Sequence, residues 1–133
     1  MTHGFRPAQR LKRPADFTAV RNRSSRAECG SFFLRVRLRR EGDGPATARL
    51  GIVASRKVGN AVTRNRIKRR FREIFRRHPG LLPEGCDVVV VARPSTAAAD
   101  YATLEAAFVL GVEKALRRVR RPRERKPDGE ERV

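Results

Sequence analysis

The chain has few of the residues that build metal sites, disulfide frameworks or membrane spans. It contains two cysteines, one tyrosine and no tryptophan in 133 residues. Cys29 and Cys86 lack a CxxC spacing, and with only His3 and His78 beside them they do not form a zinc set. We interpret both thiols as small apolar residues or spectators and expect Cys86 to be buried. No stretch approaches 18 apolar residues, and the apolar run 88–92 has only the length of a strand, so a transmembrane helix is not expected.

Acidic residues are scarce as well. The chain has 14 of them against 32 lysines and arginines, which gives a net charge of +18. This charge favours a polyanionic partner, nucleic acid first and an acidic membrane surface second. Residues 1–14 lack the hydrophobic core of a signal peptide, so we expect a cytoplasmic protein. Residues 79–116 carry a net charge of −3, and we therefore expect the final helix to face solvent or to pack behind the cationic surface.

The hydrophobic pattern predicts a single small α+β domain with one mixed sheet packed against helices. Its order is helix, strand, strand, helix, strand, helix, and the first two strands are expected to form a hairpin. The expected elements are helix 14–20, loop 21–30, strand 31–40, turn 41–45, strand 48–55, helix 61–78, strand 87–93 and helix 101–116. We assign residues 1–13 to a basic flexible N-terminus, 14–116 to an RNA-binding domain, and 117–133 to a charged, disordered C-terminal tail.

The segment 60–78, NAVTRNRIKRRFREIFRRH, is the most informative part of the chain. Its apolar residues Ile67, Phe71, Ile74 and Phe75 fall on one face of a helix, and cations fill the remaining circumference against one acid. Many cations are spaced i, i+4, which costs a few tenths of a kcal/mol for each like-charged pair. A solvated helix usually mixes the two signs, so we expect this helix to lie on a polyanion.

Catalytic groups are not visible in the sequence. There is no nucleophile elbow, HExxH or P-loop, and the acids are dispersed. Ser55 and Lys57 instead belong to a short segment, 55–60, that extends the cationic helix surface toward the sheet. Phe17 and Phe33 either present rings to unstacked bases, as proteins that bind single-stranded nucleic acid do, or pack in the core.

Residues 56–69, RKVGNAVTRNRIKR, closely resemble the signature of the bacterial ribonuclease P protein subunit. The resemblance extends over about residues 5–118. It implies a sheet packed against helices with an unusual left-handed βαβ crossover, against the usual rule. It also implies a small subunit whose RNA partner performs the cleavage, which is the magnesium-dependent hydrolysis that removes the 5′ leader of precursor tRNA. The protein then needs no catalytic residues of its own.

The resemblance also implies which residues bind. Contacts to the catalytic RNA would come from Arg56, Lys57, Arg64, Asn65, Arg66, Lys68 and Arg69. A cleft between the first helix and the sheet would hold the single-stranded leader through Phe17, Phe33, Arg35, Val53, Ser55, Lys57 and Arg93. Mg2+ would be held mainly by RNA phosphates, with none bound by the protein alone. The partners would be ribonuclease P RNA and precursor tRNA, and neither DNA nor a membrane is expected.

The sequence departs from the family pattern at two positions of the expected cleft. Arg21 and Arg35 stand where relatives often place aromatic residues, so cationic contacts would partly replace stacking. The main alternative is a ribosomal or other structural RNA-binding protein with no role in cleavage. A helix-turn-helix regulator is disfavoured because no second helix lies shortly before the basic helix. An autonomous nuclease is disfavoured because catalytic groups are lacking.

Overall fold

The computed structural model describes residues 7–22, 24–39 and 46–120. The turn expected at 41–45 and most of the expected C-terminal tail lie outside the described residues. The described elements, in chain order, are η1 (Pro7–Gln9), α1 (Pro14–Asn22), β1 (Ser25–Glu28), β2 (Phe32–Leu38), β3 (Arg49–Val53), η2 (Arg56–Val58), α2 (Ala61–Arg77), β4 (Cys86–Ala92), η3 (Pro94–Ala98) and α3 (Tyr101–Arg120), where η marks a short 3-10 helix. The α+β class with one mixed sheet is confirmed.

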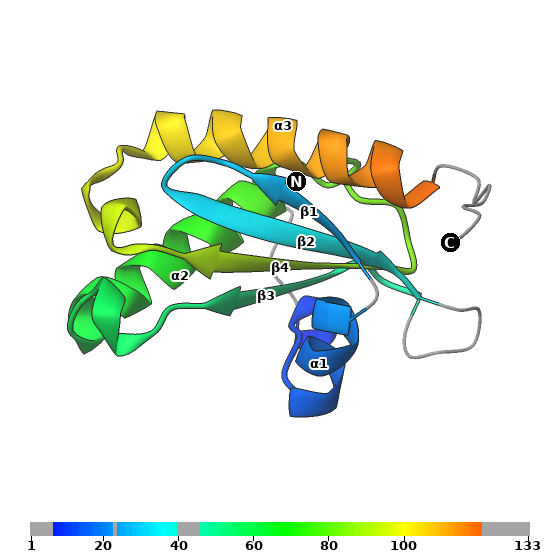
Figure 1. The fold of residues 1–133 in the computed structure, drawn as a ribbon, viewed down its shortest axis with the longest axis horizontal. Helices are drawn as coiled ribbons and strands as arrows, with labels where there is room; N and C mark the ends of the chain where they lie inside the picture. Colours follow the sequence, from blue (N-terminus) through cyan, green and yellow to red (C-terminus); the bar gives the residue numbers. More distant parts are fainter. Residues whose placement is uncertain (1–6, 23, 40–45, 121–133) are drawn as a thin grey trace, which may run out of the picture.

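The four strands form one sheet in the order β1-β2-β4-β3 (Figure 1). β2 runs antiparallel to both β1 and β4, whereas β3 runs parallel to β4. The expected hairpin between residues 31–40 and 48–55 is therefore wrong, because β4 lies between these two strands. The parallel pair β3 and β4 is connected through α2, as a βαβ unit requires. β4 is a central strand and is buried along most of its length, as its continuous apolar sequence predicts.

The sequence analysis missed β1. It lies inside residues 21–30, which we expected to be a loop, and it pairs with β2 from Ser25 opposite Val36 to Glu28 opposite Phe33. Both ends of the chain also carry more structure than expected. Leu11 is buried, and its N–H donates to the carbonyl of Leu50 on β3 (3.0 Å), so residues 7–13 lie along the sheet edge. At the other end, α3 continues to Arg120.

The basic helix is confirmed, and its start and inner face are those that the sequence predicts. Asn60 caps α2 by accepting a hydrogen bond from the N–H of Thr63 at its side-chain oxygen (2.9 Å). The four apolar residues predicted to share one face, Ile67, Phe71, Ile74 and Phe75, are all buried. Their packing holds the cations of α2 on the outside of the domain.

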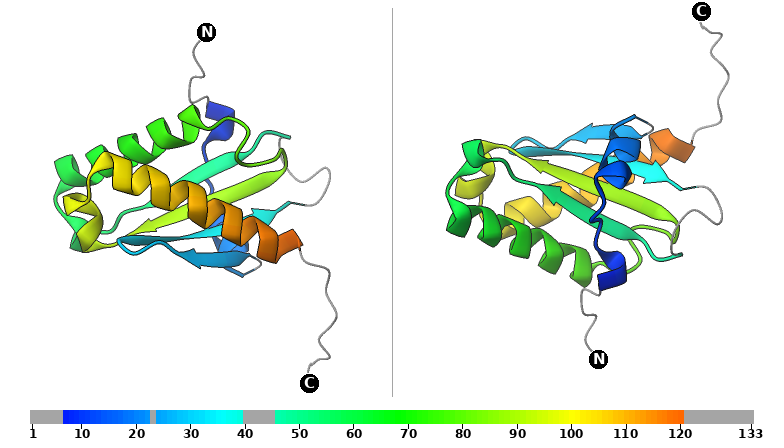
Figure 2. Two further views of the ribbon diagram at one scale, coloured as in Figure 1. Left: turned by 90° about the horizontal axis from the view of Figure 1, so that it is seen from above. Right: turned by 90° about the horizontal axis from the view of Figure 1, so that it is seen from below.

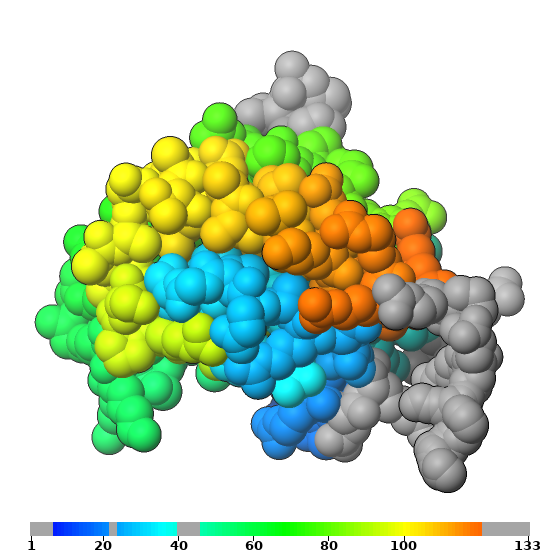
Figure 3. All heavy atoms as spheres, turned by 45° about the horizontal axis from the view of Figure 1, so that its top comes forward, coloured from blue at the N-terminus to red at the C-terminus, as the bar shows by residue number. Residues whose placement is uncertain are grey.

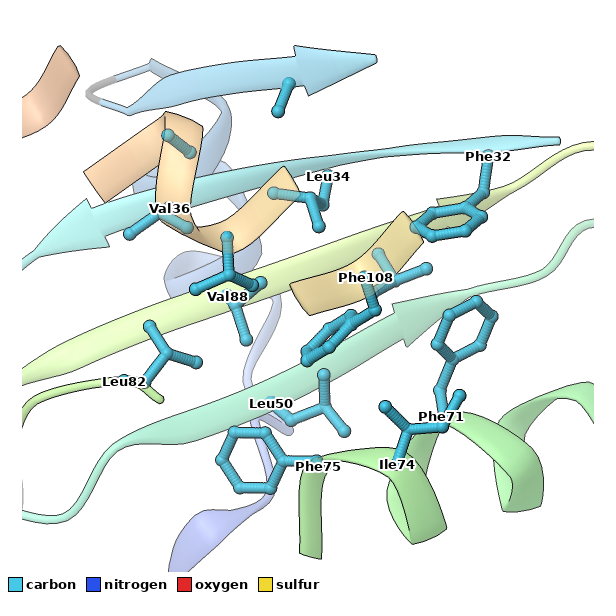
Figure 4. Close-up of a cluster of buried hydrophobic side chains, with 14 of the residues drawn as sticks. Phe32, Leu34, Val36, Leu50, Phe71, Ile74, Phe75, Leu82, Val88 and Phe108 are labelled. Atoms are coloured by element: carbon cyan, nitrogen blue, oxygen red, sulfur yellow. The ribbon is translucent and has the colours of Figure 1, made fainter. Parts of the chain in front are cut away.

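The helices form layers on the two faces of the sheet (Figures 1 and 2). α2 and α3 cover one face, and the main core lies between them and the sheet. In this core Phe71 packs edge-on against Phe32, with ring centroids 4.9 Å apart, and lies 6.2 Å from Phe108 of α3 (Figure 4). α1 crosses the opposite face, where Val20, Leu11 and Val89 form a smaller cluster. Because α1 is short, part of this second face stays open.

Candidate nucleic-acid interface

Three cations in the C-terminal half of α2 contact other groups of the protein. Arg70 donates from Nη1 to the carbonyl of Ala99 (3.3 Å), and Arg76 pairs with Glu73 on the same helix. Arg77 lies near a carboxylate of α3. These side chains have intramolecular partners, and their charge is offset within the domain.

The cations in the N-terminal half of α2 are presented differently. Asn65, Arg66 and Arg69 are exposed, whereas Arg64 and Lys68 are half-buried. Arg64 donates from Nε to the carbonyl of Gly59 (3.2 Å), which fixes its side chain over the loop that precedes the helix. Within the described part of the chain, neither Arg66 nor Arg69 forms an ion pair with a carboxylate. This end of α2 is therefore a concentrated positive surface without internal compensation.

The loop between β3 and α2 adds two more exposed cations, Arg56 and Lys57, on η2. Gly59 follows them with φ 157°, in the region that favours glycine, and a Cβ there would lie 2.9 Å from Cγ2 of Thr63. The close turn at Gly59 therefore brings η2 directly beside the first turn of α2. All seven residues expected to bind the catalytic RNA lie on this loop and the first half of α2.

Three rows of side chains cross the sheet on the face opposite α2 and α3. The strand register defines them as Glu28–Phe33–Val91–Val53, Arg26–Arg35–Val89–Gly51, and Arg37–Asp87–Arg49. α1 covers parts of the second and third rows, over β2 and β4 as well as at Gly51 of β3. A Cβ on Gly51 would lie 2.7 Å from Cε1 of Phe17, so the Phe17 ring rests directly on this glycine. The first row is left open, and Val53 at its end is 40% exposed.

Phe33 lies in the open row with a cation over its ring. The guanidinium carbon of Arg26 is 3.8 Å from the ring centroid and that of Arg93 is 5.2 Å away. Glu28 accepts from Nη2 of Arg93 (2.7 Å) and from Nε of Arg26 (2.9 Å), and these hydrogen bonds, the one from Arg93 foremost, lower the pKa of Glu28. Bases that approach this site therefore meet an aromatic ring already stacked with guanidinium.

The start of η3 holds Arg93 in place at the margin of the open row. The Arg93 N–H donates to Oγ1 of Thr96 (2.9 Å), and the hydroxyl of Thr96 donates to the carbonyl of Ser31 (2.6 Å). The Arg93 side chain donates from Nη1 to the carbonyl of Gly30 (3.0 Å). A side chain with these contacts is ordered before any ligand arrives.

The residues expected to hold the leader share this face. Phe33 and Val53 belong to the open row, and Arg35 lies in the adjacent row, opposite Arg26 on β1. Two arginines directly opposite each other on a sheet are destabilising unless a counter-charge is supplied. The remaining expected residues, Phe17, Ser55, Lys57 and Arg93, lie on α1, after the end of β3 and after the end of β4.

Comparison with known proteins identifies the family. The family model described as Ribonuclease P matches residues 5–119. The chain belongs to the ribonuclease P protein family. It is 37% identical over 108 residues to the ribonuclease P protein component of Brevibacillus brevis, covering 81% of this chain and 83% of the relative. It is 40% identical over 121 residues to that of Thermobifida fusca, covering 88% and 80%.

Solved structures of ribonuclease P proteins have the same fold. The Thermotoga maritima protein superposes with a TM-score of 0.68 at 32% identity, over 79% of this chain and 96% of that one. The Staphylococcus aureus protein gives 0.68 at 28% identity, over 84% and 95%. The chain is thus the protein component of ribonuclease P, an endoribonuclease that processes tRNA and contains a catalytic RNA.

Sequence reasoning missed two parts of this ribonuclease P protein's positive surface. Arg26 was overlooked because β1 has only one buried residue, Ala27, and four residues are too few for a clear alternation. Arg10 was overlooked because the N-terminal segment was not expected to pack on the sheet, where it lies near Arg72 of the predicted basic helix. Burial lowers the pKa of Arg72, and the nearby charge of Arg10 lowers it further, so these two cations lie close together.

Neither a metal cluster nor a membrane span is found in the described ranges. No group of three or more His, Cys, Asp or Glu side chains in residues 7–22, 24–39 and 46–120 could hold a metal ion. No helix of these ranges is long and apolar enough to cross a bilayer. Both thiols are free, and Cys86 is buried as expected. The interface offers cations, one stacked aromatic and an apolar row, which are the kinds of groups through which proteins contact nucleic acids.

Proposed function

We propose that this protein binds the RNA subunit of ribonuclease P and the 5′ leader of precursor tRNA on two adjoining surfaces. It thereby assists the magnesium-dependent endonucleolytic removal of the leader, and the RNA subunit supplies the catalysis. The observation that carries this proposal is a contrast between two sets of cations on α2. Arg70, Arg76 and Arg77 contact other groups of the protein. Arg66 and Arg69 are exposed and, among the described residues, form no ion pair with a carboxylate.

The surface for the RNA subunit comprises the first half of α2 and η2. Arg66 and Arg69 are exposed cations one turn apart, and Arg56 and Lys57 lie beside them across the turn at Gly59. Such a cluster fits the closely spaced phosphates of a folded RNA. Contacts of this kind position the RNA and carry no base specificity.

The surface for the leader is the open sheet face. Its row of Phe33, Val91 and Val53 offers apolar area to unstacked bases, and the flanking Arg93 and Lys57 face their phosphates. Single-stranded RNA needs both kinds of contact, because its bases are exposed to solvent. Lys57 belongs to both surfaces, so the leader would enter this face next to the RNA subunit.

Mg2+ would be held mainly by RNA phosphates, and the protein's part is to position RNA rather than to bind the metal. We also propose that the crossover from β3 through α2 to β4 is left-handed, as the family resemblance implies, and that the protein acts in the cytoplasm. An experimental structure at side-chain resolution would test the handedness directly.

Equilibrium binding tests the two surfaces separately. The holoenzyme is assembled with a bacterial ribonuclease P RNA, and its affinities for precursor tRNA and for mature tRNA are compared. Val53→Asp places a negative charge on the open row and is expected to weaken binding of precursor tRNA about tenfold without affecting mature tRNA. Leu110→Asp, on the exposed side of α3, is the matched control.

The RNA-subunit surface is tested with the protein and the RNA alone. Arg66→Ala is expected to weaken this complex. It should also lower the slope of log affinity against log salt concentration by about 1, because one phosphate contact is lost. Arg77→Ala removes the same charge from the same helix on the side that faces α3, and it should change the affinity little. Equal losses in the two variants would contradict the proposed surface.

A further inference from the structure

One flank of the C-terminal half of α3 faces the edge strand β1. Lys114 and Arg118 are exposed, and their spacing of four residues places them on the same side of the helix. The guanidinium of Arg118 donates to the backbone carbonyl of Arg26 on β1. Lys114 lies near Cys29, just after β1, where its charge counters part of the rise that burial causes in the pKa of that thiol.

The opposite flank of the same helix carries a similar charge. Arg120 is exposed there, and Arg117 is exposed on the outer side of the helix, between the two flanks. Arg120 lies near Cys86 at the start of β4, where its charge acts on the thiol. Figure 3 shows the C-terminal half of α3 lying directly against β1. The helix thus provides two pairs of exposed cations, and Lys114 and Arg118 are the pair that adjoins β1.

Arg26 joins the flank of α3 to the open sheet face. Its backbone carbonyl accepts from Arg118 on one side of β1, and its side chain stacks on Phe33 on the other. Glu28 is the carboxylate at this junction, and both Arg26 and Arg93 donate to it. Among the described residues, a run of four cations with one acid therefore extends from Arg93 around the sheet edge to Lys114.

This edge is suited to a polyanion rather than to a peptide strand. An edge strand adds a peptide through its free backbone groups. On β1, the carbonyl of Arg26 already accepts from Arg118, and the side chains around it are long and charged. A phosphate backbone needs no strand pairing and is attracted by the net positive charge of the junction.

We propose that the leader-binding surface continues past Phe33, around β1, onto the flank of α3 lined by Lys114 and Arg118. Phosphates of leader nucleotides far from the cleavage site bind there. The inference rests on the proposed function, because it takes the leader to enter beside Lys57 and to cross the open row. It also revises the expectation that α3 lies apart from the anion-binding surface.

The width of the sheet fixes the leader length that matters. Neighbouring strands lie about 4.8 Å apart, so the open row from Val53 to Glu28 spans about 14 Å over three intervals. If the leader keeps the spacing of about 3.4 Å per nucleotide that one strand of a duplex has, about four nucleotides cover the row. A leader of four nucleotides ends on the sheet face, whereas a leader of twelve is long enough to pass around β1 to α3.

The test compares these two leader lengths in the assembled holoenzyme. Wild type, Lys114→Ala with Arg118→Ala, and Arg117→Ala with Arg120→Ala are measured for affinity to precursor tRNA across a salt series. The two double variants remove equal charge from the same helix. We expect the Lys114/Arg118 variant to bind the twelve-nucleotide leader about tenfold more weakly, with a salt slope smaller by about 1.4, and to bind the four-nucleotide leader normally.

Two single variants distinguish the loss of a phosphate contact from a disturbance of the packing between α3 and β1. Lys114→Glu leaves the hydrogen bond of Arg118 in place and should weaken binding of the long leader alone. Arg118→Lys keeps the positive charge and should retain most of the affinity, because lysine binds phosphate as a point charge. The Arg117/Arg120 variant should keep the wild-type dependence on leader length.

An unchanged length dependence in the Lys114/Arg118 variant would overturn the proposal. So would an equal loss for both leaders, which would place the contact on the RNA subunit instead. If wild-type protein itself gave no preference for precursor over mature tRNA, the proposed function would fail first. The two failures are therefore distinguishable.

Discussion

Arg49 on β3 forms a two-pronged ion pair with Asp87 on β4, from Nε to Oδ1 at 2.9 Å and from Nη2 to Oδ2 at 3.0 Å. These hydrogen bonds raise the pKa of Arg49. Asp87 is completely buried and is also approached by Arg37 on β2 and by Arg39, which follows this strand. Arg49 reaches Asp16 of α1 as well (3.5 Å). One carboxylate thus ties three strands together and, through Arg49, connects them to the helix that bears Phe17.

Asp87→Asn is expected to destabilise the protein by about 3 kcal/mol or more, because it removes the buried negative charge that three arginines share at the end of the sheet. Urea unfolding of both proteins measures the difference. Glu113→Gln, an exposed change on α3, is the control and should cost less than about 0.5 kcal/mol. If Asp87→Asn lowered the free energy of unfolding by less than about 1 kcal/mol, the ion pairs of Asp87 would not be what holds the three strands together.

Gly51→Ala is expected to displace the Phe17 ring, because the added Cβ would lie 2.7 Å from it. The predicted cost in stability is about 1–3 kcal/mol, and leader affinity should fall while affinity for the RNA subunit is retained. Thermal unfolding and precursor binding measure the two effects. Gly80→Ala, with no atom within 4 Å of the new Cβ, should change neither. Unaltered leader binding in Gly51→Ala would remove Phe17 from the leader surface.

Arg35→Phe is expected to reduce the salt dependence of leader binding and to increase discrimination among bases. It removes one cation from the face, which lowers the slope by about 0.7, and adds a ring worth about 1–3 kcal/mol per stacked base. Affinities for leaders of different sequence, measured against salt concentration, test both effects. Identical slopes for the two proteins would contradict a cationic role for Arg35.

The thiol of Cys29 is expected to be unreactive near neutral pH, because burial raises its pKa to about 11. At pH 8 the thiolate fraction should be about 100-fold below that of an ordinary cysteine. The folded state holds this proton more tightly than the unfolded chain. The contribution of Cys29 to the free energy of unfolding is therefore fully present below pH 9, the ordinary pKa of the thiol, and is lost as the pH rises through about 11. Iodoacetamide labelling from pH 7 to 10, read by mass spectrometry in a Cys86→Ala background, tests this. Labelling at the rate of a free thiol at pH 8 would refute the burial of Cys29.

The parts of the fold that depend on local pattern were predictable from the sequence. α2 has four apolar residues at helical spacing and the N-cap Asn60, and β4 has a continuous apolar run, so both were found with nearly correct ends. Strand pairing was not predictable. β3 pairs with β4 rather than with β2, and that choice depends on contacts distant in sequence, such as the pair of Arg49 and Asp87.

The candidate site was predictable to the same extent. The pattern of α2 marked the helix as an RNA-binding element, but it could not show that Arg70 is held by the carbonyl of Ala99 while Arg66 is presented to the outside. The sequence alone does not distinguish Arg66 from Arg70, because the helix has cations on nearly all of its circumference. Arg26 could not be found, because a four-residue edge strand leaves almost no periodic signal.

The proposed function requires the protein to promote leader removal through the first half of α2. The most direct measurement is cleavage of a precursor tRNA at low magnesium by a bacterial ribonuclease P RNA, with and without this protein. We predict correct 5′ processing only when the protein is present, loss of that gain with Arg64→Ala and Arg66→Ala together, and retention with Arg77→Ala. If the protein binds the RNA and cleavage stays unchanged, the account is contradicted and the chain is a structural RNA binder.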